Sequence, residues 1–345
     1  MLTRHVPDGI YRPVSEPRSR GAHRQVEYRD MDRKREYRCG CEKVIRPVVC
    51  VLAILLLALS GAGAAETGGR PKILGVAFVQ IDVEDMQTAT RFYHETLQLP
   101  NLTCCCFRLD SHCFFINLYQ QVNLIKLEPS PKQNRINAIG IYTSDVGALR
   151  KYLLARGEKP EELVNDAHGY TSFEIKDPEN HTIEFVQQPQ GVAGSISGPA
   201  PRASRMIHAG FVVKDRAKMD KFYRDVLGFR LYWSGGLKDG ETNWVAMQVP
   251  DGTDWIEYML NVNPNADKRE LGVMNHISLG VVSVKAAAEQ LQKAGVKLPE
   301  EPKIGRDGKW QLNLYDPDWT RVELMEFTPV EKPCCSEFTG AHPKP

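Results

Sequence analysis

Short apolar runs alternate with amphipathic segments between residues 73 and 327, and their order predicts a repeating series of strands and helices. Residues 73–81 and 206–213 are apolar runs typical of buried strands. Each run is followed by a segment with helical spacing that carries Phe-Tyr and Leu on one face. After the second such helix, three strands are expected at 229–235, 242–249 and 254–260, with a hairpin turn at 250–252.

The same order of elements returns within each half of this region. Strands are expected at 136–143 and 273–282, followed by helices at 146–155 and 286–293. Each of these helices precedes two more strands around an Asp-Pro turn: 171–174 with 182–186, and 310–315 with 321–327. The segments FYHETLQL and FYRDVLGF lie 130 positions apart. The pattern therefore predicts four βαβββ modules, and an internal repeat of this kind is stronger evidence than any single strand.

Composition divides the four modules into two pairs. Residues 189–204 are rich in Gly, Pro and Ser and show no periodicity, which is typical of a linker. We therefore expect an α+β protein with two tandem domains, at 73–188 and 205–328, and a tail with Pro and Cys at 329–345.

The four modules resemble the vicinal oxygen chelate superfamily, which includes glyoxalase I, the bleomycin-resistance proteins and the extradiol dioxygenases. The matching segments are MIHAGFVVKDRAKMDKFYRDVLGF, DWIEYML, MNHISLGV and DPDWTRVELMEF. The resemblance covers residues 73–188 and 205–328, and it is specific to the fold rather than to one reaction. It implies that pairs of modules curl around an open cleft that often holds a divalent metal ion.

Two His and two Glu residues occupy matching positions in the last two modules. His208 and Glu257 lie in the first and last strands of the third module, and His276 and Glu323 lie in the corresponding strands of the fourth. Taken alone, a His in an apolar strand is more often a core residue, and a Glu on such a strand usually faces solvent. The matched set instead predicts a site for one divalent ion, with nickel, cobalt, zinc, manganese and iron(II) all open. The resemblance places metal ligands at the same four positions.

The first domain lacks this set and is expected to hold no metal. The aligned pairs are Phe78 with His208, Ala138 with His276, Lys126 (or Glu128, after a small register shift) with Glu257, and Glu184 with Glu323. A complete site within 205–328 requires that the third and fourth modules face each other, as in two-domain extradiol enzymes. The alternative is a homodimer in which sites are completed between swapped chains.

Three functions remain open at this point. The four-ligand set resembles glyoxalase I and related isomerases or lyases, in which Glu323 or Glu257 would shuttle a proton on a small oxygen-chelating substrate. An extradiol-type dioxygenase would use His208, His276 and Glu323, but residues 305–310 contain no His and Asn313 stands where Tyr is expected. A non-catalytic small-molecule binder fits the first domain better than the second. Trp319 occupies a turn position that the family usually gives to Gly, so a left-handed backbone is expected there.

The first 65 residues form an N-terminal extension that predicts export. Residues 1–46 carry a net charge of +5, residues 48–59 are an apolar run, and small residues follow up to Ala65. This order is typical of a signal peptide, so we expect a secreted or periplasmic protein without a stable membrane partner. The alternative is a membrane anchor at 47–65.

Residues 66–345 carry a net charge of −4, which gives no reason to expect a nucleic-acid partner. Six Cys residues follow the signal peptide, and in an exported protein we expect at least one disulfide of undetermined connectivity.

Overall fold

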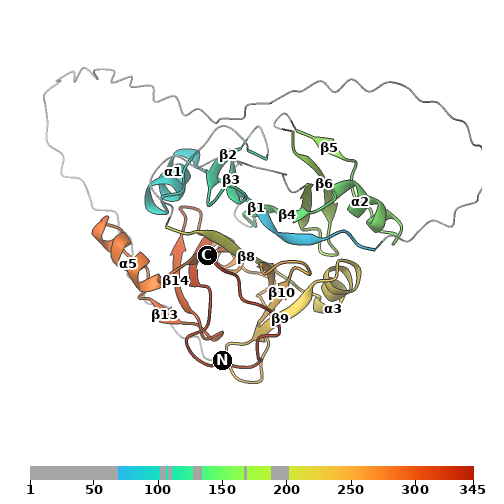
Figure 1. Ribbon diagram of the computed structural model, residues 1–345. Helices are drawn as coiled ribbons and strands as arrows, with labels where there is room; N and C mark the ends of the chain where they lie inside the picture. Colours follow the sequence, from blue (N-terminus) through green and yellow to red (C-terminus); the bar gives the residue numbers. More distant parts are fainter. Residues whose placement is uncertain (1–68, 102–105, 108–110, 127–133, 167–168, 188–201) are drawn as a thin grey trace, which may run out of the picture. The chain divides into compact units, whose positions relative to one another are not determined.

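The computed structural model describes residues 69–101, 106–107, 111–126, 134–166, 169–187 and 202–345 (Figure 1). The predicted signal peptide and most of the predicted linker lie outside these residues and stay predictions. Within the described ranges, no helix is both long and apolar enough to cross a bilayer. Below, the first half means the described residues up to 187, and the second half means 202–345.

The described strands form two mixed sheets, one in each half (Figure 1). The first sheet has the order β2-β3-β1-β4-β7-β6-β5. Its strands are β1 (Ile73–Val83), β2 (His112–Phe115), β3 (Gln121–Lys126), β4 (Ile136–Thr143), β5 (Val164–Asn165), β6 (Thr171–Lys176) and β7 (Thr182–Gln187). The antiparallel pair β1–β4 joins the first two modules into one continuous sheet.

The second sheet repeats this plan with the order β13-β14-β15-β12-β8-β11-β10-β9. Its strands are β8 (Arg205–Val212), β9 (Arg230–Gly235), β10 (Trp244–Gln248), β11 (Trp255–Met259), β12 (His276–Val281), β13 (Lys303–Ile304), β14 (Trp310–Tyr315) and β15 (Arg321–Glu326). The predicted α+β fold of tandem βαβββ modules is confirmed. The third and fourth modules share one sheet through the antiparallel pair β8–β12, as a complete site within the second half requires.

Each module has a helix after its first strand, and every such helix begins at a capping side chain. The helices are α1 (Met86–Thr90, continued by η1, Arg91–Thr96), α2 (Val146–Leu154), α3 (Arg216–Asp220, continued by η2, Lys221–Val226) and α5 (Val284–Lys293). Their caps Asp85, Asp145, Asp215 and Ser283 each accept a hydrogen bond from the backbone N–H three residues later. These bonds satisfy amide groups that the helix itself leaves unpaired.

One predicted strand begins too early. Residues 273 and 274 belong to α4 (Lys268–Met274), not to the strand predicted at 273–282. The helix starts at Asp267, whose side chain accepts a hydrogen bond from the N–H of Glu270. Because α4 is only 7 residues long, its apolar spacing cannot be separated by pattern from the strand that follows.

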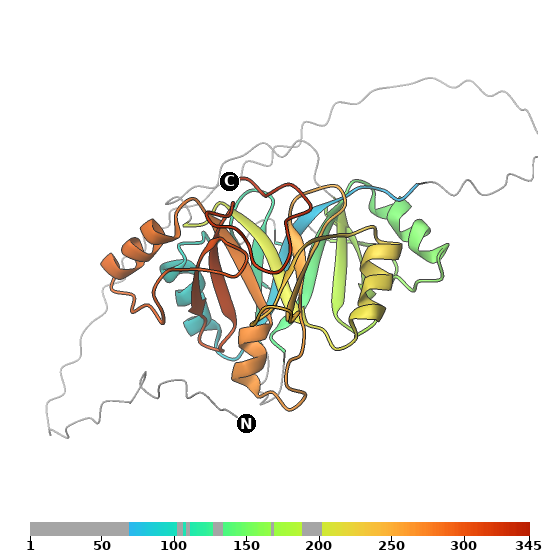
Figure 2. The ribbon, with the colours of Figure 1, turned by 90° about the horizontal axis from the view of Figure 1, so that it is seen from below.

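The helix of one half packs against an Asp-Pro turn of the other half. The hydroxyl of Tyr93 donates to Asp316 Oδ2 at 3.1 Å, and that of Tyr223 donates to Asp177 Oδ2 at 3.1 Å. Figure 2 shows this exchange, with α1 beside the red strands of the second sheet and α3 beside the green strands of the first. The two halves therefore share buried polar contacts.

Two further expectations concern the backbone and the cysteines. Trp319 has φ 71°, which confirms the predicted left-handed turn, and Asn180 has φ 68° at the matching turn of the first half.

The structure pairs Cys106 with Cys113 and Cys334 with Cys335. This agrees with the expectation of at least one disulfide.

Candidate metal centre

Four neighbouring strands of the second sheet carry the predicted ligand residues. β8 and β12 lie side by side, β11 flanks β8 and β15 flanks β12. The register places His276 and Glu257 beside Gly210, and His208 and Glu323 beside Ser278. Because alternate residues of a strand point to one face of its sheet, all four side chains lie on the same face.

The ligand atoms of these side chains converge. His208 Nε2 and His276 Nε2 are 3.0 Å apart. Glu257 Oε2 lies 3.3 Å from His276 Nε2 and 3.9 Å from His208 Nε2. Glu323 Oε2 lies 3.5 Å from His208 Nε2. His208, Glu257 and His276 form a compact set within 4.8 Å of one another, and Glu323 adjoins that set through His208.

The separations and the hydrogen bonds of this group fit a divalent ion. Two ligands at about 2.1 Å from an ion and at right angles to each other are about 3.0 Å apart. His276 Nδ1 lies 3.0 Å from the carbonyl oxygen of Met274, and an N–H donated there leaves the lone pair on Nε2. His208 Nδ1 is buried and has no hydrogen-bond partner within the described part of the chain.

Gly210 and Trp255 shape the space around the two rings. A Cβ atom at position 210 would lie 2.0 Å from Cε1 of His276, so only Gly leaves room for that imidazole. The ring of Trp255 stacks on His208 with centroids 4.8 Å apart. The importance of Gly210 depends on the register between β8 and β12, which the sequence alone does not show.

Burial sets the protonation of the group in the absence of an ion. It lowers the pKa of His208 and of His276 well below the usual range, so both imidazoles are neutral, as metal ligands must be. Burial also raises the pKa of Glu257 and of Glu323 to about 7, although the nearby Arg321 acts in the opposite direction. A bound cation would favour the ionised carboxylates and release their protons.

The register of the first sheet tests the alignment of the two halves. In the first sheet, Phe78 pairs with Gly140, and Gly140 pairs with Glu184. In the second sheet, His208 pairs with Ser278, and Ser278 pairs with Glu323 in the same way. Ala138 takes the place of His276, because it lies opposite Gln80 as His276 lies opposite Gly210. These three pairs agree with the sequence alignment.

The fourth predicted pair, Lys126 with Glu257, was wrong. The counterpart of Glu257 is Asn123, which lies opposite Gln80, and not Lys126. Phe78 and Asn123 are 45 residues apart, whereas His208 and Glu257 are 49 apart, so the connection is shorter in the first half. The alternative residue, Glu128, lies outside the described residues. Among the described first-half positions that match the ligand set, none carries an imidazole.

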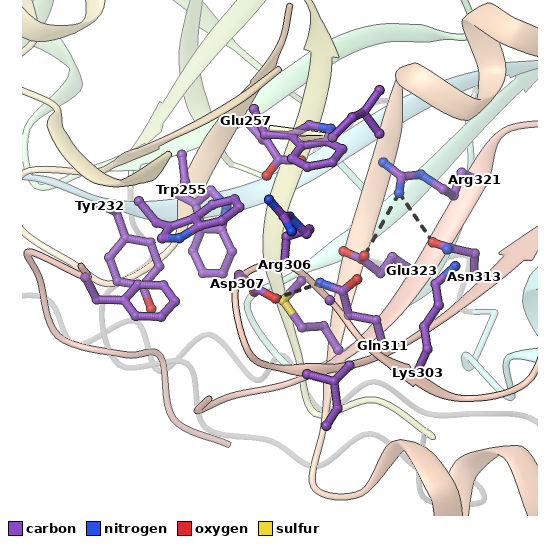
Figure 3. A pocket seen from close by; sticks show the side chains of 18 residues that line it. Tyr232, Trp255, Glu257, Lys303, Arg306, Asp307, Gln311, Asn313, Arg321 and Glu323 are labelled. Atoms are coloured by element: carbon purple, nitrogen blue, oxygen red, sulfur yellow. Dashed lines mark hydrogen bonds and ion pairs between the residues drawn. The ribbon is translucent and has the colours of Figure 1, made fainter. Parts of the chain in front are cut away.

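A cavity of about 340 Å³ opens beside the carboxylates of Glu257 and Glu323 (Figure 3). Its aromatic side chains are Tyr232, Trp233, Trp244, Trp255 and Phe338. Its polar side chains besides the two Glu residues are Lys303, Arg306, Asp307, Gln311, Asn313 and Arg321. In Figure 3, Trp255 and Tyr232 lie on one side of the cavity and Arg321, Asn313 and Lys303 on the other. An aromatic wall therefore faces a polar, cationic wall.

The C-terminal tail supplies part of the aromatic wall. Phe338 packs on Tyr232 with ring centroids 4.8 Å apart. The tail is held by hydrogen bonds from Thr339 N to the carbonyl of Tyr232 at 3.0 Å, and from Gln248 Nε2 to that of Ala341 at 2.9 Å. Sequence reasoning missed this role, since the tail has no apolar periodicity that would indicate burial.

A buried cation lies behind the aromatic wall. Lys309 is fully buried. Its Nζ lies 3.3 Å from the Tyr232 hydroxyl and 4.7 Å from the centre of the Trp255 ring. Burial lowers the pKa of Lys309 to about 8, against the opposing effect of Asp307. No pattern in the sequence indicates the burial of Lys309, because a Lys in a hairpin loop is normally exposed.

Comparison with known proteins finds a family model for the second half. Residues 205–324 match the family model of the Glyoxalase/Bleomycin resistance protein/Dioxygenase superfamily. This part of the chain is therefore similar to members of that superfamily. The match ends just beyond Glu323 and includes all four predicted ligand residues.

Curated relatives of the superfamily segment include lyases and epimerases. A probable chloroplastic lactoylglutathione lyase of Arabidopsis thaliana is 28% identical over 134 residues, which are 38% of each protein. The lactoylglutathione lyase of Haemophilus influenzae is 28% identical over 124 residues, covering 35% of this chain and 92% of that protein. Mouse mitochondrial methylmalonyl-CoA epimerase is 28% identical over 129 residues, 35% of this chain and 71% of the relative.

Solved structures match both halves of the chain. The 2,3-dioxygenase LapB from Pseudomonas sp. KL28 superimposes with a TM-score of 0.58 at 17% identity, covering 80% of this chain and 96% of that one. Homoprotocatechuate 2,3-dioxygenase from Arthrobacter globiformis gives 0.56 at 17% identity, with 75% and 82% covered. At this identity the likeness establishes a shared two-sheet glyoxalase/dioxygenase fold and nothing about the reaction.

Proposed function

We propose that the second half is a divalent-metal-dependent enzyme of the isomerase or lyase type, which moves a proton at a carbon next to an oxygen of a small substrate. The observation that carries this proposal is the convergence of two neutral imidazoles and two carboxyls at the wall of a cavity. The names of the lactoylglutathione lyase and methylmalonyl-CoA epimerase relatives support the same class.

The roles of the four residues follow from their spacing. His208, His276 and Glu257 form the compact set that would hold the ion, which would polarise a substrate oxygen. Glu323 lies at the edge of that set and lines the cavity, so we assign it the proton transfer. Burial raises the pKa of Glu323 to about 7 without an ion, and a bound cation would hold the group ionised, ready to accept a proton.

Extradiol ring cleavage has less support. The resemblance to extradiol enzymes implies an acid–base His around the last hairpin, but residues 305–310 contain no His. Asn313, an amide with no acid–base role, lies opposite Glu323 in the sheet and lines the cavity. Glu257 would also crowd a ligand triad of His208, His276 and Glu323.

The test uses the full chain with its native metal restored, the glutathione hemithioacetal of methylglyoxal and methylmalonyl-CoA as substrates, and deuterium uptake from solvent as readout. We expect turnover of one substrate class, and a loss of at least ~100-fold in Glu323→Gln with the ion retained. Glu257→Gln should lose the ion as well.

Glu184→Gln removes the matching carboxylate of the first half and serves as the control, so it should retain both the ion and the turnover. Ring cleavage of a catechol with dioxygen uptake, or an unaffected Glu323→Gln variant, would contradict the proposal.

A further inference from the structure

The cations that line the cavity differ in how their charges are balanced. Lys303 Nζ lies 2.6 Å from Glu300 Oε2. Arg306 pairs with Asp239, and its Nε donates to the carbonyl of Gly236 at 3.1 Å. Neither Glu300 nor Asp239 lines the cavity. These two cations are therefore already neutralised by carboxylates behind or beside the wall.

Arg321 lacks a comparable partner. In the part of the chain that the structure describes, the one carboxylate within 4.0 Å of it is that of Glu323, 4.0 Å from Nη1. Nη1 also donates a long hydrogen bond of 3.4 Å to Asn313 Oδ1, and Nε is buried with no hydrogen-bond partner. Only 14% of the side chain is exposed, so water compensates little of its charge.

Metal loading leaves this charge uncompensated. On the proposed function, on which this inference rests, a divalent ion offsets the two negative charges of Glu257 and Glu323. Among the described cations that line the cavity, Arg321 then remains as the one without a carboxylate to balance its charge. A buried charge without a partner is costly, and a ligand that brings one negative charge removes that cost.

The opposite wall defines the rest of the ligand. Trp255 and Tyr232 present aromatic surface across the cavity from Arg321 (Figure 3), and Phe338, which also lines the cavity, packs on Tyr232. A volume of about 340 Å³ is at the lower end of the range for small-molecule pockets. The cavity thus suits a compact molecule with an anionic end and an apolar end.

We propose that the substrate is a small carboxylic acid with an apolar or aromatic group, and that Arg321 binds its carboxylate. A guanidinium matches the planar carboxylate with two parallel hydrogen bonds. A single uncompensated cation favours a carboxylate over a phosphate monoester, which carries about −1.5 to −2 charges at neutral pH.

The experiment measures binding by titration calorimetry to the full chain loaded with cobalt(II). The probes are mandelate, its neutral analogue mandelamide, and phenyl phosphate. The variants are Arg321→Gln, Arg321→Lys and Lys303→Gln, with Arg216→Gln as a control that removes a cation outside the cavity. Circular dichroism and metal content establish that each variant is folded and loaded.

We expect the wild type to prefer mandelate over mandelamide by at least ~10-fold, and Arg321→Gln to abolish that preference through weaker mandelate binding. Arg321→Lys keeps the charge without the planar fork and should retain part of the preference. Lys303→Gln and Arg216→Gln should change mandelate affinity less than ~3-fold, because each of these cations already has a carboxylate partner.

Several outcomes would overturn the inference: no binding of mandelate, equal affinity for mandelate and mandelamide, an equal loss in Lys303→Gln, or tighter binding of phenyl phosphate. A parallel titration of metal-stripped protein separates the two proposals. If stripped protein keeps the full Arg321-dependent preference and the loaded protein turns over neither substrate class, the anion site stands and the metal-dependent function fails. If Arg321→Gln keeps wild-type preference while binding still requires cobalt, the inference fails and the metal centre stands.

Discussion

At the scale of single residues, the site depends on buried side chains that their neighbours hold in one orientation. His276 is fully buried, donates through Nδ1 to the Met274 carbonyl, and fits only because position 210 is Gly. Its Nε2 lies 3.0 Å from that of His208, which suits either a hydrogen bond between two neutral rings or a cation held by both.

We therefore expect His208→Ala and His276→Ala each to weaken metal binding by at least ~100-fold while the fold is retained. Each change removes a neutral donor and leaves two carboxyls close together. Metal content after gel filtration, compared with His112→Ala on the exposed end of β2, checks this expectation. Full occupancy in both site variants would mean that the four residues are structural.

Trp319 shows strain at one residue. It has φ 71° in the turn between β14 and β15, and the guanidinium carbon of Arg269 lies 4.2 Å from its ring centre. A non-Gly residue in this region costs roughly 1–2 kcal/mol.

Two substitutions separate the strain from the ring contact. Trp319→Ala and Trp319→Gly both lose the contact with Arg269, but only Gly relieves the backbone. After the greater freedom of Gly in the unfolded chain is allowed for, Trp319→Gly should be more stable than Trp319→Ala by about 0.5–1 kcal/mol. Urea unfolding of both variants measures the difference, and equal midpoints would show that the turn is unstrained.

At the scale of elements, the buried carboxyl of Asp316 lies in the contact between η1 and the turn after β14. Asp316 accepts hydrogen bonds from Tyr93 and from the backbone N–H groups of Asp318 and Thr320. Burial outweighs these bonds and raises the pKa of Asp316 to about 7. In the unfolded chain the same group titrates near its ordinary value of 3.8.

The sign of the pH dependence follows from these two values. Between about pH 4 and pH 7 the folded protein holds a proton on Asp316 that the unfolded chain has lost. The stability from this group is therefore fully present below pH 4 and is lost as the pH rises to about 7. Asp316→Asn should flatten that part of the profile, by up to about 1.4 kcal/mol per pH unit.

Chemical unfolding of Asp316→Asn and of the wild type at pH 5, 6, 7 and 8 measures the difference. The variant should gain stability relative to the wild type as the pH rises. Tyr93→Phe removes one hydrogen bond to the carboxyl without removing the titrating group, so it should lower stability while the slope between pH 5 and 7 persists. A constant difference between Asp316→Asn and wild type would show that Asp316 does not titrate in this range.

At the scale of the whole molecule, the two halves have diverged on one plan. The first sheet keeps the glutamate at position 184 but has Phe78, Asn123 and Ala138 where the second sheet has its other ligands. The halves share buried contacts such as Tyr223 with Asp177, so the first half supports the second even though its matching positions lack imidazole. We expect one divalent ion per full chain.

Export is a second prediction at the scale of the whole chain. Residues 47–65 are uncharged and lie between a basic segment and the first sheet, which predicts a cleaved signal peptide. N-terminal sequencing of protein from its native host should find a start at residue 65 or 66. A chain that begins before Val48 would contradict the prediction and favour the anchor.

The sequence by itself determined the modular plan, because strand and helix periodicity is a local property of the chain. It also predicted the matched set of ligand residues, since a duplicated module places equivalent residues in equivalent strands. The set is His208, Glu257, His276 and Glu323. Phe78, Ala138 and Glu184 were aligned correctly for the same reason.

Only the tertiary structure decided the remaining features, because each depends on which strands pair and in what register. Asn123 replaces Lys126 as the counterpart of Glu257 because the connection before it is four residues shorter. Phe338 reaches the cavity through hydrogen bonds between the tail and β9 and β10 that leave no pattern in the sequence. The weak pairing of Arg321 and the spacing of the ligand atoms also depend on the sheet. Both are set by the distances between neighbouring strands, and no single segment determines them. The strands are β8, β11, β12 and β15.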